Sequence, residues 1–122
     1  MPMKTLSSFA LGISLVAVPA VALEIVPGVY DVQGTENDGT TQYQEVIKIS
    51  VSSDGNCQFD LGVEPDVIPG LCLIDGDVLS ASSVIGGHWF GLYRATAEGV
   101  LHGTWPIEGA TGTGSETLTL RK

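Results

Sequence analysis

Residues 46–61 read VIKISVSSDGNCQFDL, and this stretch contains the pattern that decides the fold. Every second residue from Ile47 to Val51 is apolar, and the same holds from Cys57 to Leu61. Because side chains alternate between the two faces of a strand, each run has one apolar face and one polar face. Asp54-Gly55 lies between the runs and favours a tight hairpin turn. We therefore predict an antiparallel pair of half-buried strands.

The rest of the chain after residue 22 repeats this organisation. Glycine, present 16 times in the sequence, separates short β-type runs, and no 3.6-residue apolar period is found there. Short turns without a crossover helix predict an all-β domain, an up-and-down antiparallel barrel of about eight strands, with a two-sheet sandwich as the alternative. Closure into a barrel removes the exposed edges of an open sheet. The expected strands are 28–34, 42–52, 56–61, 71–74, 78–83, 88–96, 100–105 and 116–120.

The first 22 residues have the pattern of a secretory signal peptide. Lys4 supplies a positive charge, the run 6–22 carries no charge, and Ala20-Val21-Ala22 offers a cleavage site. A retained anchor helix is the alternative, because about 17 apolar residues is the lower limit of a bilayer span. We expect a signal peptide at 1–22 and a single domain at 23–122. That domain would be periplasmic or extracellular, with no membrane association after cleavage.

The charge of the chain is strongly acidic. It has 14 acidic and 5 basic residues, and loss of Lys4 with the signal lowers the formal net charge from −9 to −10. Binding to a nucleic-acid backbone requires clustered basic residues, so nucleic acid is excluded as a partner. A basic protein partner would be attracted, although acidity also serves solubility alone.

Cys57 and Cys72 are the two cysteines of the chain. In an exported protein the default expectation is that they pair with each other. The strand expected at 71–74 returns alongside the strand expected at 56–61, which makes the bridge geometrically reasonable. Metal ligation is the weaker alternative, because there is no Cys-x-x-Cys and neither His88 nor His102 has finger-like spacing. We expect a disulfide and no metal site.

No catalytic motif is found in the sequence. Both the nucleophile elbow Gly-x-Ser-x-Gly and the phosphate loop are missing, and the carboxylate pairs lie in expected turns. We expect a protein that is not an enzyme and that uses no cofactor. One acid breaks the strand pattern, since Glu116 shares a face with Leu118 and Leu120. A buried carboxylate needs a partner, and we predict an ion pair between Glu116 and Arg94.

Four aromatic residues lie on two neighbouring expected strands: Trp89, Phe90, Tyr93 and Trp105. They could line a pocket for a small apolar ligand. The alternative, favoured here, is a solid core, because the interior of an eight-stranded barrel is barely wide enough for its own side chains.

Several motifs carry a resemblance. After residue 22 the chain opens with GVYDVQG (28–34) and Asn37-Asp38-Gly39, and it closes with GTW (103–105) and GTGSETLT (112–119). The two cysteines precede GLYR (91–94), a Gly-Leu-x-x-Tyr pattern with the tyrosine one place early. These features resemble a set of small exported proteobacterial proteins, some labelled fibronectin-binding, which is similar to avidin-like or lipocalin-like barrels. The resemblance implies the fold and assigns no residue-level site.

The function expected from the sequence is binding rather than catalysis. We predict an exported binding or interaction domain whose partner is an unidentified protein or a small apolar ligand. The alternative is a periplasmic inhibitor of a secreted hydrolase. In that case the acidic loop with Glu64 and Asp66 would meet a basic cleft.

Overall fold

The computed structural model describes residues 23–83, 89–106 and 111–122. The signal peptide expected at 1–22 and the histidine at position 88 lie outside the described residues. In the described part, no helix has the length and hydropathy needed to cross a membrane.

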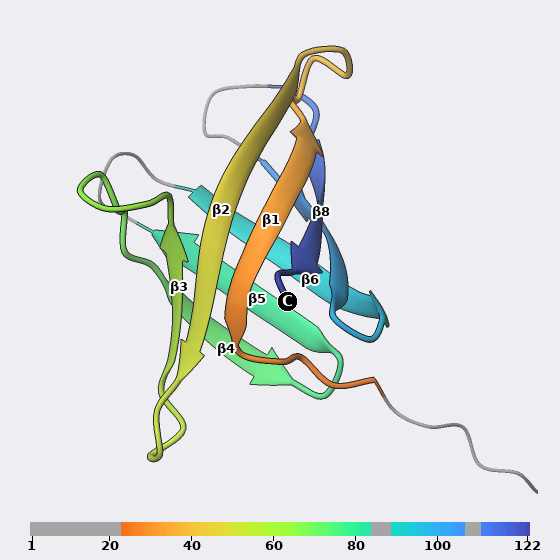
Figure 1. Ribbon diagram of the computed structural model, residues 1–122. Helices are drawn as coiled ribbons and strands as arrows, with labels where there is room; N and C mark the ends of the chain where they lie inside the picture. The colour runs from red at the N-terminus through yellow and green to blue at the C-terminus, as the bar shows by residue number, and fades with distance from the viewer. Residues whose placement is uncertain (1–22, 84–88, 107–110) are drawn as a thin grey trace, which may run out of the picture.

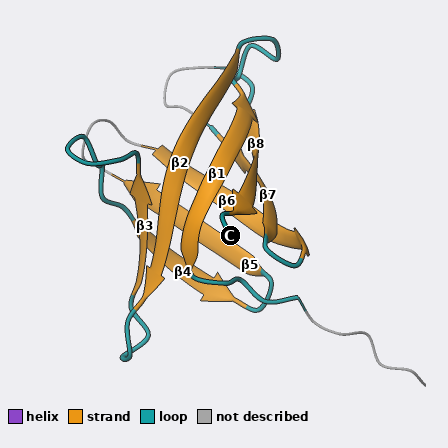
Figure 2. Cartoon of the chain, viewed as in Figure 1, coloured by secondary structure: helices purple, strands orange, loops and turns teal. Residues whose placement is uncertain are grey.

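The described chain is an all-β protein whose eight antiparallel strands form a closed barrel in sequence order (Figures 1 and 2). This confirms the predicted up-and-down barrel, and the closed sheet rules out the two-sheet sandwich. The strands are β1 (Gly28–Thr35), β2 (Gln42–Val51), β3 (Cys57–Leu61), β4 (Leu71–Asp75), β5 (Val78–Ser83), β6 (Trp89–Ala97), β7 (Val100–Trp105) and β8 (Gly114–Leu120).

The barrel closes through β1, which pairs with β2 on one side and with β8 on the other. Tyr30 lies opposite Ile47 on β2 and opposite Leu120 on β8. The shortest ladder joins β3 to β4, where only two residue pairs are in register, followed by an isolated bridge between Leu61 and Ile68. This ladder is therefore the weakest seam of the sheet.

The core fills the barrel interior with alternate side chains of the strands, as the period-two pattern predicts. Its largest fully buried members are Tyr30, Tyr93, Phe59, Ile47, Ile49, Leu79, Leu101, Leu118 and Val32.

Residues that precede β1 complete one end of this core. Ile25 is buried in it, and Leu23 packs against it. The Tyr30 hydroxyl donates a hydrogen bond of 2.5 Å to the carbonyl oxygen of Val26, which fixes the segment to the strand that follows. Side chains of the chain itself thus fill the barrel at the end where β1 starts.

The predicted disulfide is confirmed. Cys57 on β3 lies directly opposite Cys72 on β4, with a Cα–Cα distance of 5.0 Å, and their sulfur atoms are bonded. Both residues are buried, so the bridge lies on the inner side of the weakest seam. A bonded pair of this kind is compatible with an oxidising compartment.

Replacing both cysteines by alanine should lower the free energy of unfolding by about 3 kcal/mol, because the bridge closes a 15-residue loop in the unfolded chain. Urea denaturation of oxidised wild type, reduced wild type and the double variant measures this. The two unbridged proteins should unfold at the same urea concentration. A difference from the oxidised protein of less than about 1 kcal/mol would show that the ladder alone holds the seam.

Candidate functional site

A cavity of about 350 Å³ opens in the barrel. Its walls come from the last residues of odd-numbered strands and the first residues of even-numbered strands, which an up-and-down barrel brings to the same end. This end carries the β1–β2 turn and lies opposite the end where β1 starts (Figure 1). The lining residues are Glu36, Tyr43, Gln44, Glu45, Phe59, Leu61, Trp89, Tyr93, Trp105 and Glu116.

One row of paired residues builds the wall of this cavity. Across β2, β1, β8, β7 and β6 the register places Tyr43, Gly34, Glu116, Gly103 and Tyr93 side by side. A tyrosine therefore stands at each end of the row, the carboxylate stands in the middle, and a glycine separates each tyrosine from it.

The two glycines provide the space that the tyrosine rings occupy. A Cβ atom at Gly34 would lie 2.2 Å from Cζ of Tyr43, and a Cβ atom at Gly103 would lie 2.1 Å from Cδ2 of Tyr93. Neither distance is tolerable, so each ring lies flat over a glycine on the way to the central carboxylate. The missing side chain at Gly103 lets a ring approach the backbone closely.

Glu116 is only 6% exposed, and two phenol hydroxyls satisfy it. Tyr93 Oη donates to Oε2 over 2.6 Å, and Tyr43 Oη donates to Oε1. Trp105 Nε1 donates to Tyr43 Oη over 2.8 Å and extends the network by one side chain. Its ring also lies over a glycine, because a Cβ atom at Gly114 would lie 2.3 Å from it. The network fixes three aromatic side chains around one carboxylate.

Both phenols of this network are held in their neutral form. Burial raises the pKa of Tyr43, and the hydrogen-bonded Glu116 raises it further. Burial also raises the pKa of Tyr93, with the negative charge of Glu116 as the second cause. A phenol with a raised pKa remains a hydrogen-bond donor and does not supply the anion that a nucleophile or general base requires.

Two further carboxylates, Glu45 and Glu36, lie at the opening of the cavity. Glu45 lies on the same face of β2 as Ile47 and Ile49, which point into the barrel. Its side chain is nevertheless exposed, because the barrel interior is open at the cavity end. Desolvation raises the pKa of Glu45, and the negative charges of Glu116 and Glu36 raise it further. Glu36 is held by the β1–β2 turn, in which its N–H donates to the carbonyl oxygen of Thr41 over 2.7 Å. Among the residues that the structure describes, none that lines the cavity is Lys, Arg or His.

Aromatic rings make up the rest of the wall. Phe59 packs against Trp89 with ring centroids 5.8 Å apart and against Tyr93 with centroids 5.2 Å apart. Tyr43 and Trp105 meet edge to face at 6.1 Å. In the part of the chain that the structure describes, Trp89 Nε1 is buried without a hydrogen-bond partner.

Three of the four aromatic residues singled out from the sequence, Trp89, Tyr93 and Trp105, line the cavity. The prediction for Phe90 is wrong. It follows Trp89 on β6, so it points to the outer face of the sheet, where its side chain is 61% exposed. There it belongs to an apolar outer strip with Leu92 on the same strand and with Leu71 and Leu73 on β4.

The predicted ion pair between Glu116 and Arg94 is also wrong. Arg94 follows Tyr93 on β6 and therefore points outward, where its Nη1 lies 3.5 Å from Oδ1 of Asp77. Glu116 is buried as predicted, but its partners are neutral hydroxyls rather than a guanidinium. Tyr43, Glu45 and Glu36 were missed. Extending the alternation of Ile47 and Ile49 two further steps toward the start of β2 would have found the first two.

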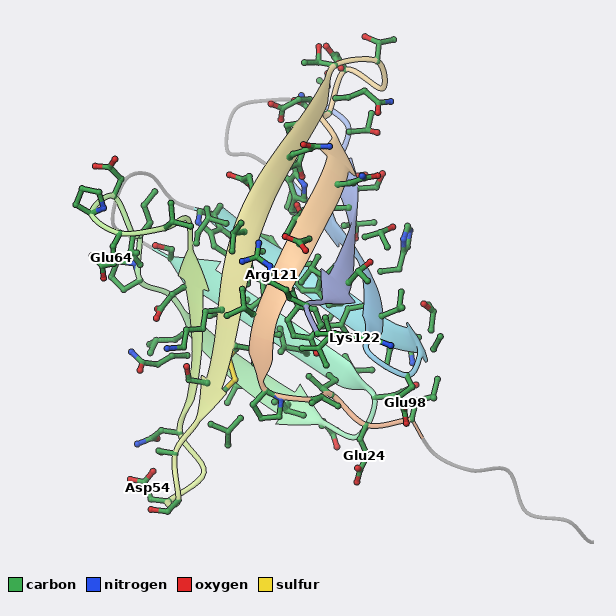
Figure 3. The ribbon with its side chains drawn as sticks, in the orientation of Figure 1. Glu24, Asp54, Glu64, Glu98, Arg121 and Lys122 are labelled. Carbon is green, nitrogen blue, oxygen red and sulfur yellow. A yellow bond between two sulfur atoms is a disulfide. The ribbon has the colours of Figure 1, made fainter. Side chains whose placement is uncertain are left out.

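Glu64 and Asp66 lie exposed in the loop 62–70 between β3 and β4, outside the cavity lining (Figure 3 labels Glu64). His102 is exposed on β7, and its Nδ1 lies 3.2 Å from Thr117 Oγ1. Among the described residues, no group of three or more His, Cys, Asp or Glu side chains is arranged to hold a metal ion.

Comparison with known protein families, with curated proteins and with solved structures finds no match to this chain.

Glu116→Gln should reduce the free energy of unfolding by about 1–3 kcal/mol, because an amide offers one oxygen where two phenols donate and leaves a buried donor unpaired. Thermal and urea unfolding measure the loss. Glu98→Gln is the matched control, since Glu98 is exposed in the β6–β7 turn at the opposite end of the barrel (Figure 3) and should change stability by less than about 0.5 kcal/mol. Equal stability of both variants and wild type would contradict the network.

The chain's three tyrosines, Tyr30, Tyr43 and Tyr93, all have raised pKa values, chiefly because of burial. A raised folded-state pKa means that stability is complete below the unfolded value of about 10 and falls above it, where the unfolded chain ionises first. The loss should approach about 1.4 kcal/mol per pH unit for each fully buried tyrosine. Absorbance at 295 nm should show no tyrosinate until the chain unfolds. A smooth titration near pH 10 in the folded protein would contradict this.

Proposed function

We propose that this protein is an exported, non-enzymatic binding protein that takes a small ligand with an aromatic or apolar portion into the mouth of its barrel. The observation that carries the proposal is the open, aromatic-lined cavity of about 350 Å³. This volume falls in the range of small-molecule sites. It corresponds to roughly a dozen non-hydrogen atoms, since a water molecule occupies about 30 Å³ in the liquid.

The wall of the cavity is organised before any ligand arrives. Gly34, Gly103 and Gly114 have no side chain, so an aromatic ring can lie against the backbone at each of them. Hydrogen bonds then fix Tyr43, Tyr93 and Trp105 in that position. Preorganised rings lose little conformational freedom on binding, which is the usual source of affinity in a small site. A solid core would instead fill this volume with larger residues at the glycine positions.

Binding fits the chemistry of the site better than catalysis does. The phenols are neutral donors, and the buried carboxylate is already engaged with both of them. The disulfide supports an exported location, because such bonds persist in oxidising compartments. A second candidate, inhibition of a secreted hydrolase, is supported by the exposure of Glu64 and Asp66 in the loop 62–70.

Ligand binding can be measured by intrinsic fluorescence, because both tryptophans of the chain, Trp89 and Trp105, line the cavity. Titration with single-ring aromatic molecules, among them 2-phenylethanol and 2-phenylethylammonium, should change their emission. We expect dissociation constants of about 1 mM or tighter for a ligand of this size.

Two variants test whether the ligand binds in the cavity or on the outer face of the barrel. Leu61→Phe adds a ring to the cavity wall and should weaken binding at least tenfold. Leu73→Ser, at a residue 76% exposed on the outer face, should leave the affinity unchanged. If no molecule of the panel alters the fluorescence, the small-ligand proposal fails and the inhibitor function is the one left. If Leu73→Ser alone abolishes binding, the site is the outer strip instead.

A further inference from the structure

Resting on the proposed function, we infer that the ligand is an organic cation, an amine or quaternary ammonium joined to an aromatic or apolar group. The inference deepens the binding proposal by naming the chemistry that this cavity selects. Three observations support it: the charge of the residues that line the cavity, the aromatic rings among them, and the hydrogen-bond geometry around Glu116.

Among the described residues that line the cavity, every charged side chain is acidic. Glu36, Glu45 and Glu116 contribute three carboxylates, and none of the described lining residues is basic. The ion pairs of the described chain, Asp31 with Arg121 and Asp77 with Arg94, lie on the outer face. Neither pair includes an acid of the cavity lining.

Like charges near a partly desolvated site repel one another, because the medium there screens less than bulk water does. The raised pKa of Glu45 reflects this directly, since Glu116 and Glu36 are its named electrostatic causes after desolvation. A ligand with a positive charge in the cavity would reverse the sign of that interaction. An anionic ligand would add a further negative charge, and the described lining residues offer no basic group to receive it.

The aromatic rings specify an organic cation rather than a small hydrated ion. Five aromatic residues line this cavity of molecular size: Tyr43, Phe59, Trp89, Tyr93 and Trp105. The faces of such rings attract ammonium groups, and rings set around a cavity are the usual means of binding methylated ammonium ligands. A divalent metal ion prefers a cage of oxygen ligands, and the described residues contain no such cage.

Glu116 retains the capacity to meet the cation. A carboxylate has about four acceptor positions on its two oxygens. Tyr43 and Tyr93 use one position on each oxygen, so acceptor capacity is left on both. The two donors also fix the carboxylate in orientation without neutralising its charge. Glu45, exposed at the opening, can then contribute a second, more adaptable contact.

The test compares four probes that share a benzene ring and differ in charge. The cations are 2-phenylethylammonium and phenyltrimethylammonium, the neutral probe is 2-phenylethanol, and the anion is 3-phenylpropionate. We expect the wild-type protein to bind both cations at least tenfold more tightly than the neutral probe, and the anion least of all. Isothermal calorimetry and tryptophan fluorescence at pH 7 and low ionic strength measure the four affinities.

A matched pair of variants assigns the preference to the cavity. Glu45→Gln keeps the size of the side chain, removes one charge, and should weaken binding of the cations by about fivefold to tenfold relative to binding of 2-phenylethanol. Glu98→Gln removes the same charge at the opposite end of the barrel and should leave all four affinities unchanged (Figure 3). Neither residue takes part in the hydrogen-bond network around Glu116, so both variants should fold like wild type.

The outcomes separate the two proposals. Binding of the neutral probe as tightly as the cations, or more tightly, would overturn the cation inference and leave the binding function standing. Equal weakening by Glu45→Gln and Glu98→Gln would also overturn it, because the preference would then reflect only the net charge of the protein. Displacement of the bound cation by Ca²⁺ at micromolar concentration would make the site a metal site. If none of the four probes binds, the proposed function itself fails.

Discussion

The structure depends on one buried carboxylate. Glu116 is removed from water in the middle of a barrel wall, where an unpaired charge would be very costly. Two phenol hydroxyls, which arrive from β2 and β6 on either side, make its burial tolerable. The two tyrosine rings can reach the carboxylate only because Gly34 and Gly103 have no side chain where the rings lie. The carboxylate, the rings and the glycines are therefore one interdependent unit, and the cavity is the space that they enclose.

The same unit separates the barrel into two functional halves. At the end where β1 starts, Ile25, Tyr30 and their neighbours form a dense apolar core that supplies the stability of the fold. At the other end Tyr43, Tyr93 and Trp105 lie against glycines of the barrel wall, so a cavity remains beside them. Small barrels generally have room only for their own side chains. In this barrel a cavity remains at one end because Gly34 on β1, Gly103 on β7 and Gly114 on β8 lie next to the acid and leave room for aromatic rings.

The fold could be predicted from the sequence because it depends on local alternation. Local sequence alone identifies the apolar face of each strand in the runs 47–51 and 57–61. The Asp54-Gly55 pair between them likewise identifies the turn. The site depends on register across five strands, which no local pattern contains. The alternation of β8 predicts that Glu116 is buried, but charge alone points to Arg94 as its partner, whereas the neighbouring Tyr93 faces inward. Membership of one strand groups Phe90 with Trp89, but consecutive residues of a strand face opposite sides.

The bridge between Cys57 and Cys72 has a consequence beyond the entropy of the unfolded chain. It crosses the shortest ladder of the sheet, and without it β3 and β4 would be the first neighbours to separate. Separation there would turn a closed barrel into an open sheet with two free edges, which are templates for pairing with another chain. One of those edges, β4, exposes Leu71 and Leu73 on its outer face. By tying β3 to β4, the disulfide keeps both of these edges paired, so Leu71 and Leu73 lie on the outer face of a closed sheet rather than along an open edge.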